Sequence, residues 1–183
     1  MKLARLISSF LAFAMAVSLV SSPARADEKG WSDASDVARN ALVLAALGVP
    51  IAKGDTDGAL QAGGSIAVTS AESWALKEAI KARRPDGSDY NSFPSGHTSV
   101  SFAAAATLHN RYGWEAGVPA YLAAGFVGVA RVKADKHKWR DVIAGAALGS
   151  ATGLLITSKR DSNVQLVPWA EPGGGGVTVA ARF

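Results

Sequence analysis

Two residues four positions apart, His137 and Asp141, have the spacing that places side chains on one face of a helix. A carboxylate in that position can hold the Nδ1 proton of the imidazole and leave Nε2 free as a nucleophile or a base. A surface ion pair has the same spacing, so this pair alone leaves both interpretations open. The chain has no cysteine, which excludes a thiol nucleophile, a disulfide framework and cysteine-ligated metal centres.

A second histidine lies in the segment Phe93-Pro94-Ser95-Gly96-His97-Thr98-Ser99, directly before an Ala-rich stretch. Proline and serine are typical of a helix start, and Gly96 would let a bound group approach the backbone closely. The free amides and the positive dipole end of such a helix favour an anion. An ordinary N-cap role for Ser95 is the alternative. The third histidine, His109, has no comparable neighbours and is expected to be structural or exposed.

Basic residues are concentrated on both sides of this segment. One cluster consists of Lys77, Lys81, Arg83 and Arg84, and the other of Arg131, Lys133, Lys136, Lys138 and Arg140. Both clusters indicate an anionic ligand, although basic residues near helix C-termini are also common as solvated partners of the helix dipole. Three of the 19 basic residues and none of the 15 acidic residues precede Asp27, so the remaining chain is nearly neutral. This balance argues against nucleic acid as a partner.

Together these positions form one pattern: Lys77-x6-Arg84-Pro85, then Pro94-Ser95-Gly96-His97, then Arg131-x5-His137-x3-Asp141. In order and internal spacing the pattern resembles the three motifs of the type 2 phosphatidic acid phosphatase superfamily. That superfamily includes bacterial acid phosphatases and vanadium-dependent haloperoxidases. The resemblance covers residues 77–141. It implies an all-α antiparallel helical bundle and a hydrolase that acts on phosphate esters.

The resemblance also implies a mechanism in which His137 attacks phosphorus and forms a phosphohistidine, while Asp141 orients its ring. His97 would donate a proton to the departing oxygen and later accept one from the water that hydrolyses the intermediate. The expected phosphate-binding groups are Lys77, Arg84, Ser95, Gly96 and Arg131. No metal ion or other cofactor is needed in this scheme, because the cations supply the charge stabilisation.

One residue departs from the family pattern. The third motif of the family normally begins Ser-Arg, whereas this chain has Ala130-Arg131. The lost hydrogen bond to a charged oxygen would cost about 1.5 to 3 kcal/mol, which corresponds to about 10- to 150-fold in rate. A phosphate- or lipid-headgroup-binding protein with weakened turnover is therefore one alternative. A vanadium-dependent haloperoxidase is another, and it is disfavoured because those enzymes are usually much larger.

The elements that must bring these residues together are five Ala-rich helices, expected at 37–52, 59–82, 96–112, 116–132 and 140–158. Short connections predict antiparallel neighbours, and hence a bundle in which the three motifs lie at one end. Small residues such as Gly145 and Gly149 are expected to let the helices pack closely. The tail is expected to form a short C-terminal β-hairpin, with strands at 164–169 and 177–183 around the glycines at 173–176.

The N-terminus has the features of an export signal. Lys2 and Arg5 precede an apolar run of 15 residues at 6–20 and the small-residue triplet Ala24-Arg25-Ala26. An uncleaved membrane helix is the alternative, although such a run is short for a hydrocarbon core of about 30 Å. We therefore expect a cleaved signal peptide at 1–26 and a single periplasmic phosphatase domain at 27–183, with 164–183 as its terminal hairpin.

A soluble bundle is favoured over one embedded in the inner membrane, because the uninterrupted apolar stretches are shorter than the roughly 20 residues of a spanning helix. In the embedded alternative the site would face the periplasm. The expected substrates are phosphate monoesters or lipid phosphates and pyrophosphates, among them undecaprenyl pyrophosphate, phosphatidylglycerol phosphate, lipid A phosphates and small organic phosphates. A membrane surface is a further candidate partner. The sequence does not rank these substrates or predict an oligomeric state.

Overall fold

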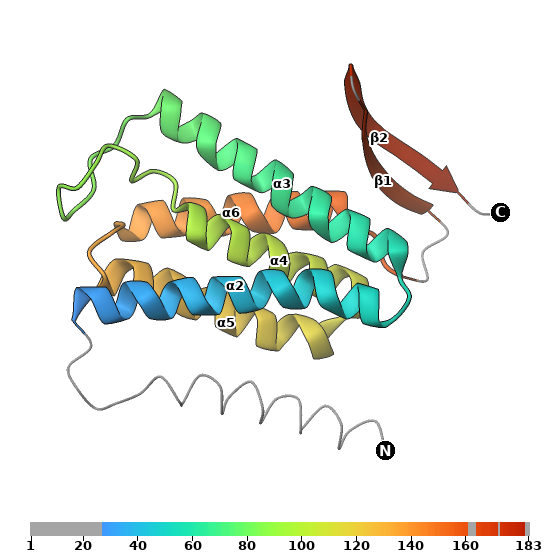
Figure 1. Ribbon diagram of the computed structural model, residues 1–183, viewed down its shortest axis with the longest axis horizontal. Coiled ribbons are helices and arrows are strands. Elements are labelled where there is room, and N and C mark those ends of the chain that lie inside the picture. The colour runs from blue at the N-terminus through green and yellow to red at the C-terminus, as the bar shows by residue number, and fades with distance from the viewer. Residues whose placement is uncertain (1–26, 161–163, 172, 182–183) are drawn as a thin grey trace.

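The computed structural model of the protein describes residues 27–160, 164–171 and 173–181. The expected signal peptide at 1–26 lies outside the described residues. The described part of the chain contains five helices: α2 (Glu28–Ala52), α3 (Thr56–Ala79), α4 (Gly96–Tyr112), α5 (Trp114–Lys133) and α6 (Trp139–Ile156). Successive helices run in opposite directions (Figure 1), which confirms the expected all-α antiparallel bundle.

Capping and turn chemistry set the helix boundaries. α4 has its expected bounds, whereas α2 begins well before residue 37, because the Asp27 carboxylate accepts a hydrogen bond from the Gly30 amide at 2.7 Å. Gly113 ends α4 and precedes α5 with a φ of 81°, a left-handed conformation that favours glycine. One residue is enough for this reversal, so α5 begins at Trp114 rather than at residue 116.

α4 forms the centre of the bundle and contacts each of the other four helices. Four consecutive alanines at 103–106 are fully buried there. Because these side chains are small, the neighbouring backbones can lie close to α4. The central helix therefore positions the residues at its N-terminal end through packing on all sides.

α6 packs against α4 through Gly145 and Gly149, which lie one turn apart on the same face. A Cβ atom on Gly145 would lie 2.7 Å from the Ser95 carbonyl oxygen, and one on Gly149 would overlap the Ser99 carbonyl. The expected close packing at these glycines is confirmed. It brings the N-terminal ends of α4 and α6 together, where the Ser95 amide donates a hydrogen bond to the Asp141 carbonyl at 3.0 Å.

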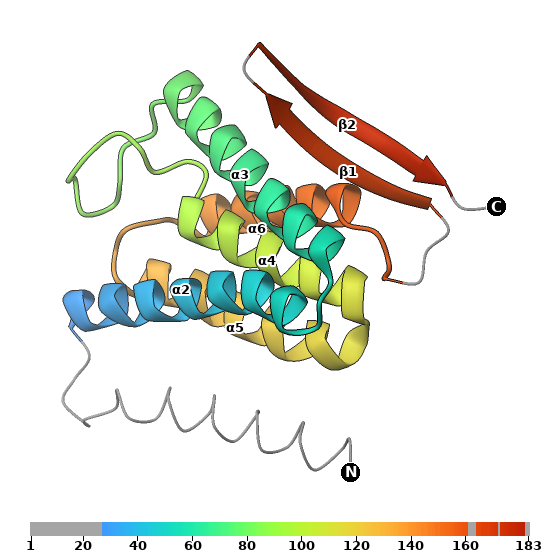
Figure 2. The ribbon, with the colours of Figure 1, turned by 45° about the vertical axis from the view of Figure 1, so that its right-hand side comes forward.

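The tail forms the expected antiparallel hairpin. β1 (Val164–Glu171) pairs with β2 (Gly174–Ala181), and Val164 lies opposite Ala181. The strands lie closer to the turn than expected. β1 ends at Glu171 rather than at residue 169, and β2 begins at Gly174 rather than at residue 177. β1 contacts α3 and α6, and Figure 2 shows the hairpin alongside the bundle. The hairpin thus docks on its own domain.

The bundle has small residues inside and many large apolar side chains outside. Leu44 of α2, Leu122 of α5 and Leu155 of α6 are 70%, 67% and 70% exposed. Among the described residues one helix, α2, is long and apolar enough to cross a membrane, and 28% of its most apolar window is buried. A core helix passes the same test of length and composition, so membrane association stays a prediction.

Candidate active site

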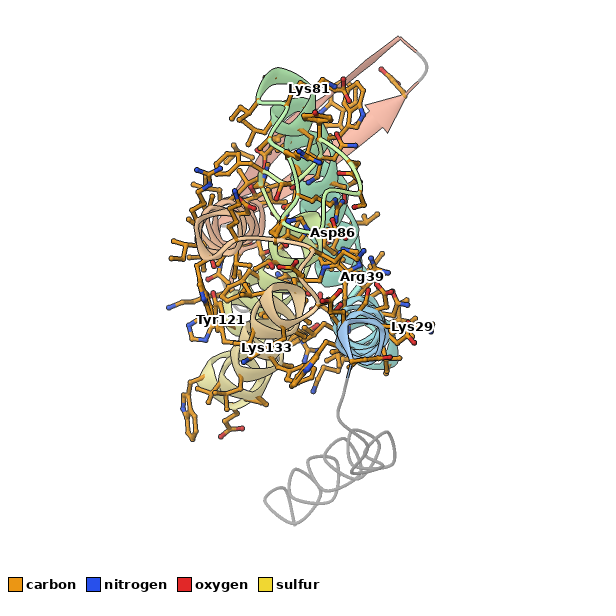
Figure 3. The ribbon with its side chains drawn as sticks, turned by 90° about the vertical axis from the view of Figure 1, so that its left-hand side faces the viewer. Lys29, Arg39, Lys81, Asp86, Tyr121 and Lys133 are labelled. Atoms are coloured by element: carbon orange, nitrogen blue, oxygen red, sulfur yellow. The ribbon has the colours of Figure 1, made fainter. Side chains whose placement is uncertain are left out.

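The three sequence motifs meet at the end of the bundle that Figure 3 views. They come from the last turn of α3, the loop between α3 and α4, the first turn of α4, the last turn of α5 and the start of α6. α2 begins at the same end, and Figure 3 labels Arg39 of this helix and Asp86 of the loop. The eight candidate residues therefore lie at one end of the bundle.

His137 is buried between these segments, with 2% of its surface exposed. Its Nδ1 donates a hydrogen bond to the Ser92 carbonyl oxygen at 2.7 Å, so the neutral ring carries its lone pair on Nε2. Burial, together with the surrounding cations, lowers the pKa of His137 to about 3. The ring is therefore neutral at neutral pH, and Nε2 has the protonation state that a nucleophile needs.

Asp141 acts on His137 through Ser92 and not through a direct hydrogen bond. Its Oδ2 lies 4.0 Å from Nδ1 of His137, which is too long for a hydrogen bond. The same oxygen accepts hydrogen bonds from the Ser92 hydroxyl at 2.6 Å and from the Lys138 amide at 2.9 Å. Asp141 therefore fixes Ser92, and Ser92 holds the imidazole through its carbonyl oxygen.

Lys77, Arg84 and Arg131 place three positive charges near His137, and all three lower its pKa. Among the described residues, only Arg84 of these three has a carboxylate at ion-pair distance, with its Nε 2.7 Å from Asp89 Oδ1. Burial and the charge of Arg84 lower the pKa of Lys77 to about 8. Partly buried cations without compensating carboxylates favour binding of an anion.

Arg131 is the most deeply buried of the three cations, with 5% of its surface exposed. Its Nη1 donates to the hydroxyls of Ser32 at 3.2 Å and Ser35 at 3.4 Å, both in α2. Its Nε is buried and has no hydrogen-bond partner among the described residues. An anionic oxygen would satisfy this donor.

Ser95 and Gly96 lie at the N-terminus of α4. Ser95 occupies the N-cap position, but its side chain makes no capping bond and its hydroxyl instead accepts from Thr98 at 2.9 Å. A Cβ on Gly96 would lie 3.7 Å from Cε of Lys77. The first turn of α4 therefore faces a cation from α3, and its backbone amides remain without a side-chain cap. This arrangement suits a bound anion.

The side chain of His97 contacts two residues of α2, which lies outside the three motifs. Its Nε2 lies 2.5 Å from Asp36 Oδ1 and 2.8 Å from Arg39 Nη1. Burial and the charge of Arg131 lower the pKa of His97 to about 4, although Asp36 opposes this shift. The second histidine is therefore also neutral at neutral pH.

Sequence analysis missed Ser92, which contacts His137, and a set in α2 that contacts Arg131 and His97: Ser32, Ser35, Asp36 and Arg39. Ser92 lies outside the three motifs, and no sequence signal marks it. Asp36 and Arg39 belong to a polar set at 32, 35, 36 and 39, whose spacing places them on one face of a helix. That spacing is a usable signal, but the helix expected at 37–52 includes only Arg39 of this set, so the shared face was not predicted.

No group of three or more His, Asp or Glu side chains arranged to hold a metal ion occurs in the part of the chain that the structure describes. The groups that the site does bring together are cationic side chains, backbone amides and two neutral histidines. These are donors for an anion and candidates for nucleophilic and acid–base chemistry.

Comparison with protein families identifies the fold. The model of the PAP2 superfamily matches residues 59–164, which is more than half of the chain. This protein belongs to the PAP2 superfamily. The matched region includes all eight candidate site residues and leaves out α2.

Two curated relatives carry specific names. The chain is 43% identical over 75 residues to a lipid A 1-phosphatase of Porphyromonas gingivalis, covering 39% of this chain and 17% of the relative. It is 32% identical over 78 residues to a lipid A 4'-phosphatase of Helicobacter pylori, covering 43% of this chain and 39% of the relative. The matched segments thus span less than half the length of either relative. No solved structure matches significantly.

Proposed function

We propose that this member of the PAP2 superfamily is a phosphatase that hydrolyses a phosphate ester of a lipid through a phosphohistidine at His137. The observation that carries the proposal is the hydrogen bond from Nδ1 of the buried His137 to the Ser92 carbonyl oxygen. Its Nδ1 is committed to the Ser92 carbonyl, and Nε2 stays unprotonated among three cations. A buried neutral imidazole beside groups that bind an anion is suited to attack on phosphorus.

In the first step Nε2 of His137 forms a bond to phosphorus while the bond from phosphorus to the ester oxygen breaks. His97, which takes up a proton when the negatively charged phosphate group binds, gives that proton to the departing oxygen. In the second step water attacks phosphorus, the P–N bond breaks, and His97 takes the proton of the water. Inorganic phosphate leaves, and both rings return to their starting states.

The remaining candidate residues bind and orient the phosphoryl group. Positioning and charge stabilisation dominate phosphoryl transfer, so the cations carry much of the catalysis. The groups proposed to contact the phosphoryl oxygens are Lys77, Arg84, Arg131, the Ser95 hydroxyl and the Gly96 amide. Asp141 contributes at a distance, because it holds Ser92 in place against His137.

A lipid phosphate is the favoured substrate class, since both relatives are named for the dephosphorylation of lipid A. The surface beside His137 supports a lipid partner. Lys138, Trp139 and Arg140 are all exposed, and 55% of Trp139 is accessible. An exposed indole between two cations suits the interface of an anionic membrane. We propose that this surface lies on the periplasmic side, in line with the export signal expected at 1–26.

A binding protein with little turnover is the second candidate. Ala130 is fully buried directly before Arg131 in α5, so the hydroxyl of the family's third motif is missing at a position where solvent cannot replace it. This candidate predicts saturable binding of vanadate, a phosphate mimic, without release of phosphate from any ester.

The two candidates are separated by measuring phosphate release in the presence of EDTA. The purified chain is assayed with a lipid phosphate in vesicles and with p-nitrophenyl phosphate, beside His137→Ala and the control His109→Ala. His109 lies in the last turn of α4, at the opposite end from His97. We expect turnover that survives EDTA, is retained in His109→Ala and is lost in His137→Ala. Vanadate binding without turnover in the unmutated chain would favour the binding protein.

A further inference from the structure

The first half of α2 contributes to the site through one polar face. Ser32, Ser35, Asp36 and Arg39 lie at spacings that place them side by side on a helix. The two serines accept hydrogen bonds from Arg131, and the other two residues contact His97. All four residues lie outside the segment that matches the family model. α2 therefore supplies contacts that the family motifs do not define.

Asp36 and Arg39 compete for the same ring nitrogen of His97. Nε2 lies 2.5 Å from Asp36 Oδ1 and 2.8 Å from Arg39 Nη1. A protonated Nε2 can donate to the carboxylate, whereas an unprotonated Nε2 can accept from the guanidinium, and it cannot do both. Nη2 of Arg39 also lies 3.7 Å from Asp36 Oδ1, so the guanidinium can pair with the carboxylate when Nε2 carries the proton.

The charges that face His97 come from two helices. Arg131 of α5 and Arg39 of α2 are cations, and Asp36 is the one acidic group among the described residues that contacts the ring. Because burial and both cations disfavour a charged imidazole, Asp36 is the group that supports its protonated form. Loss of this carboxylate would leave the positive charges of Arg131 and Arg39 beside His97.

We propose that Asp36 and Arg39 are positioning residues that set the tautomer of His97, with Asp36 holding the Nε2 proton and Arg39 holding the carboxylate. This inference rests on the proposed function of His97 as the acid and base of the reaction. With Nε2–H bound to Asp36, the proton that reaches the departing oxygen comes from Nδ1. The neutral ring then keeps its lone pair on Nδ1, which accepts the proton of the attacking water.

The pH dependence of kcat tests this assignment with three variants. His97 must be protonated in the first step, so its pKa in the enzyme–substrate complex sets the basic limb of the kcat profile. Asp36→Asn removes a negative charge and is expected to move this limb down by about one pH unit. Arg39→Gln removes a positive charge and is expected to move it up. Asp33→Asn is the matched control, because Asp33 pairs with Lys29 on an exposed face of the same helix.

Opposite shifts in Asp36→Asn and Arg39→Gln, with no shift in Asp33→Asn, would support the proposal. A purely structural role of α2 would instead lower kcat at every pH and leave the limb in place. An unchanged limb in Asp36→Asn, or shifts of the same sign in both variants, would overturn the proposal.

A second measurement keeps this test separate from the proposed function. Heteronuclear NMR of the chain with labelled histidine reports which ring nitrogen of His97 carries the proton, whether or not the chain turns over substrate. We expect the Nε2–H tautomer in the unmutated chain and in Asp33→Asn, and a shift toward Nδ1–H in Asp36→Asn. An Nδ1–H tautomer in the unmutated chain would overturn the inference even if phosphatase activity is found.

Discussion

At the residue scale, the two histidines of the site begin in the same protonation state, whereas the proposed mechanism needs opposite ones. Burial and neighbouring cations lower the pKa of His137 to about 3 and that of His97 to about 4. The neutral state suits His137 as a nucleophile, whereas His97 needs a proton for the departing oxygen. A bound phosphate group brings negative charge close to both rings, and negative charge raises the pKa of an imidazole.

This reasoning predicts that the site takes up protons when it binds an anion. At a pH between about 5 and 6, His97 is mostly neutral without an anion, and its raised pKa after binding makes it charged. Calorimetry of vanadate binding in two buffers of different ionisation enthalpy measures the number of protons exchanged. We expect net uptake in the unmutated chain and less in His97→Ala. Proton release on binding would contradict this account of the electrostatics.

The residue scale also shows what the sequence could not reveal. The three motifs were expected to meet at one end of the bundle, and their residues do gather there. The four-residue spacing left two interpretations of His137 and Asp141 open, and it did not indicate that His137 precedes α6 and that Ser92 connects the two side chains. The hydrogen bond of Nδ1 to the Ser92 carbonyl depends on the path of a loop, which no periodicity encodes.

At the element scale, the contact between α4 and α6 positions the site, because both N-terminal ends carry candidate residues. Helix type and order were predictable from alanine-rich periodicity and turn residues, and α4 was predicted with its observed bounds. The start of α2 was not predicted, because the polar face of its first half contacts Arg131 and His97 instead of water. The Asp27 N-cap, a local interaction, sets that boundary, and a polar face turned toward Arg131 and His97 offers no apolar periodicity from which to predict it.

The glycine contact makes a prediction about stability. Gly149→Ala would force a methyl group against the Ser99 carbonyl and separate the helices. Overpacking of this kind costs about 1 to 3 kcal/mol of unfolding free energy. Gly125→Ala in α5 is the matched control, because a Cβ there has no neighbour within 4 Å, and it is expected to stabilise by about 0.5 to 1 kcal/mol. Urea denaturation measures both, and equal stability of the two variants would contradict the packing argument.

At the scale of the whole molecule, exposed tryptophans lie at both ends of the bundle. Trp139 lies beside the candidate site, and Trp114 lies at the start of α5, at the opposite end. They are 55% and 70% exposed. A molecule that docks on a membrane through its catalytic end would bury the first of these and leave the second in water.

This orientation predicts a difference between lipid and soluble substrates. Burying an indole in the interface is worth about 1.5 to 3 kcal/mol, so Trp139→Ala is expected to weaken binding to anionic vesicles by about tenfold or more. Hydrolysis of p-nitrophenyl phosphate should be unaffected, because this substrate needs no membrane. Trp114→Ala is the control and is expected to bind vesicles normally. Equal losses in both variants, or none in Trp139→Ala, would contradict the proposed orientation.

The most direct test of the central claim is to trap the covalent intermediate. The chain is mixed with a substrate that carries a labelled phosphoryl group, quenched in alkali during turnover and digested for mass spectrometry. We predict an alkali-stable, acid-labile phosphoryl group on the peptide that contains His137, and no such group in His137→Ala. Label on a different residue, or undiminished turnover in His137→Ala, would contradict the account.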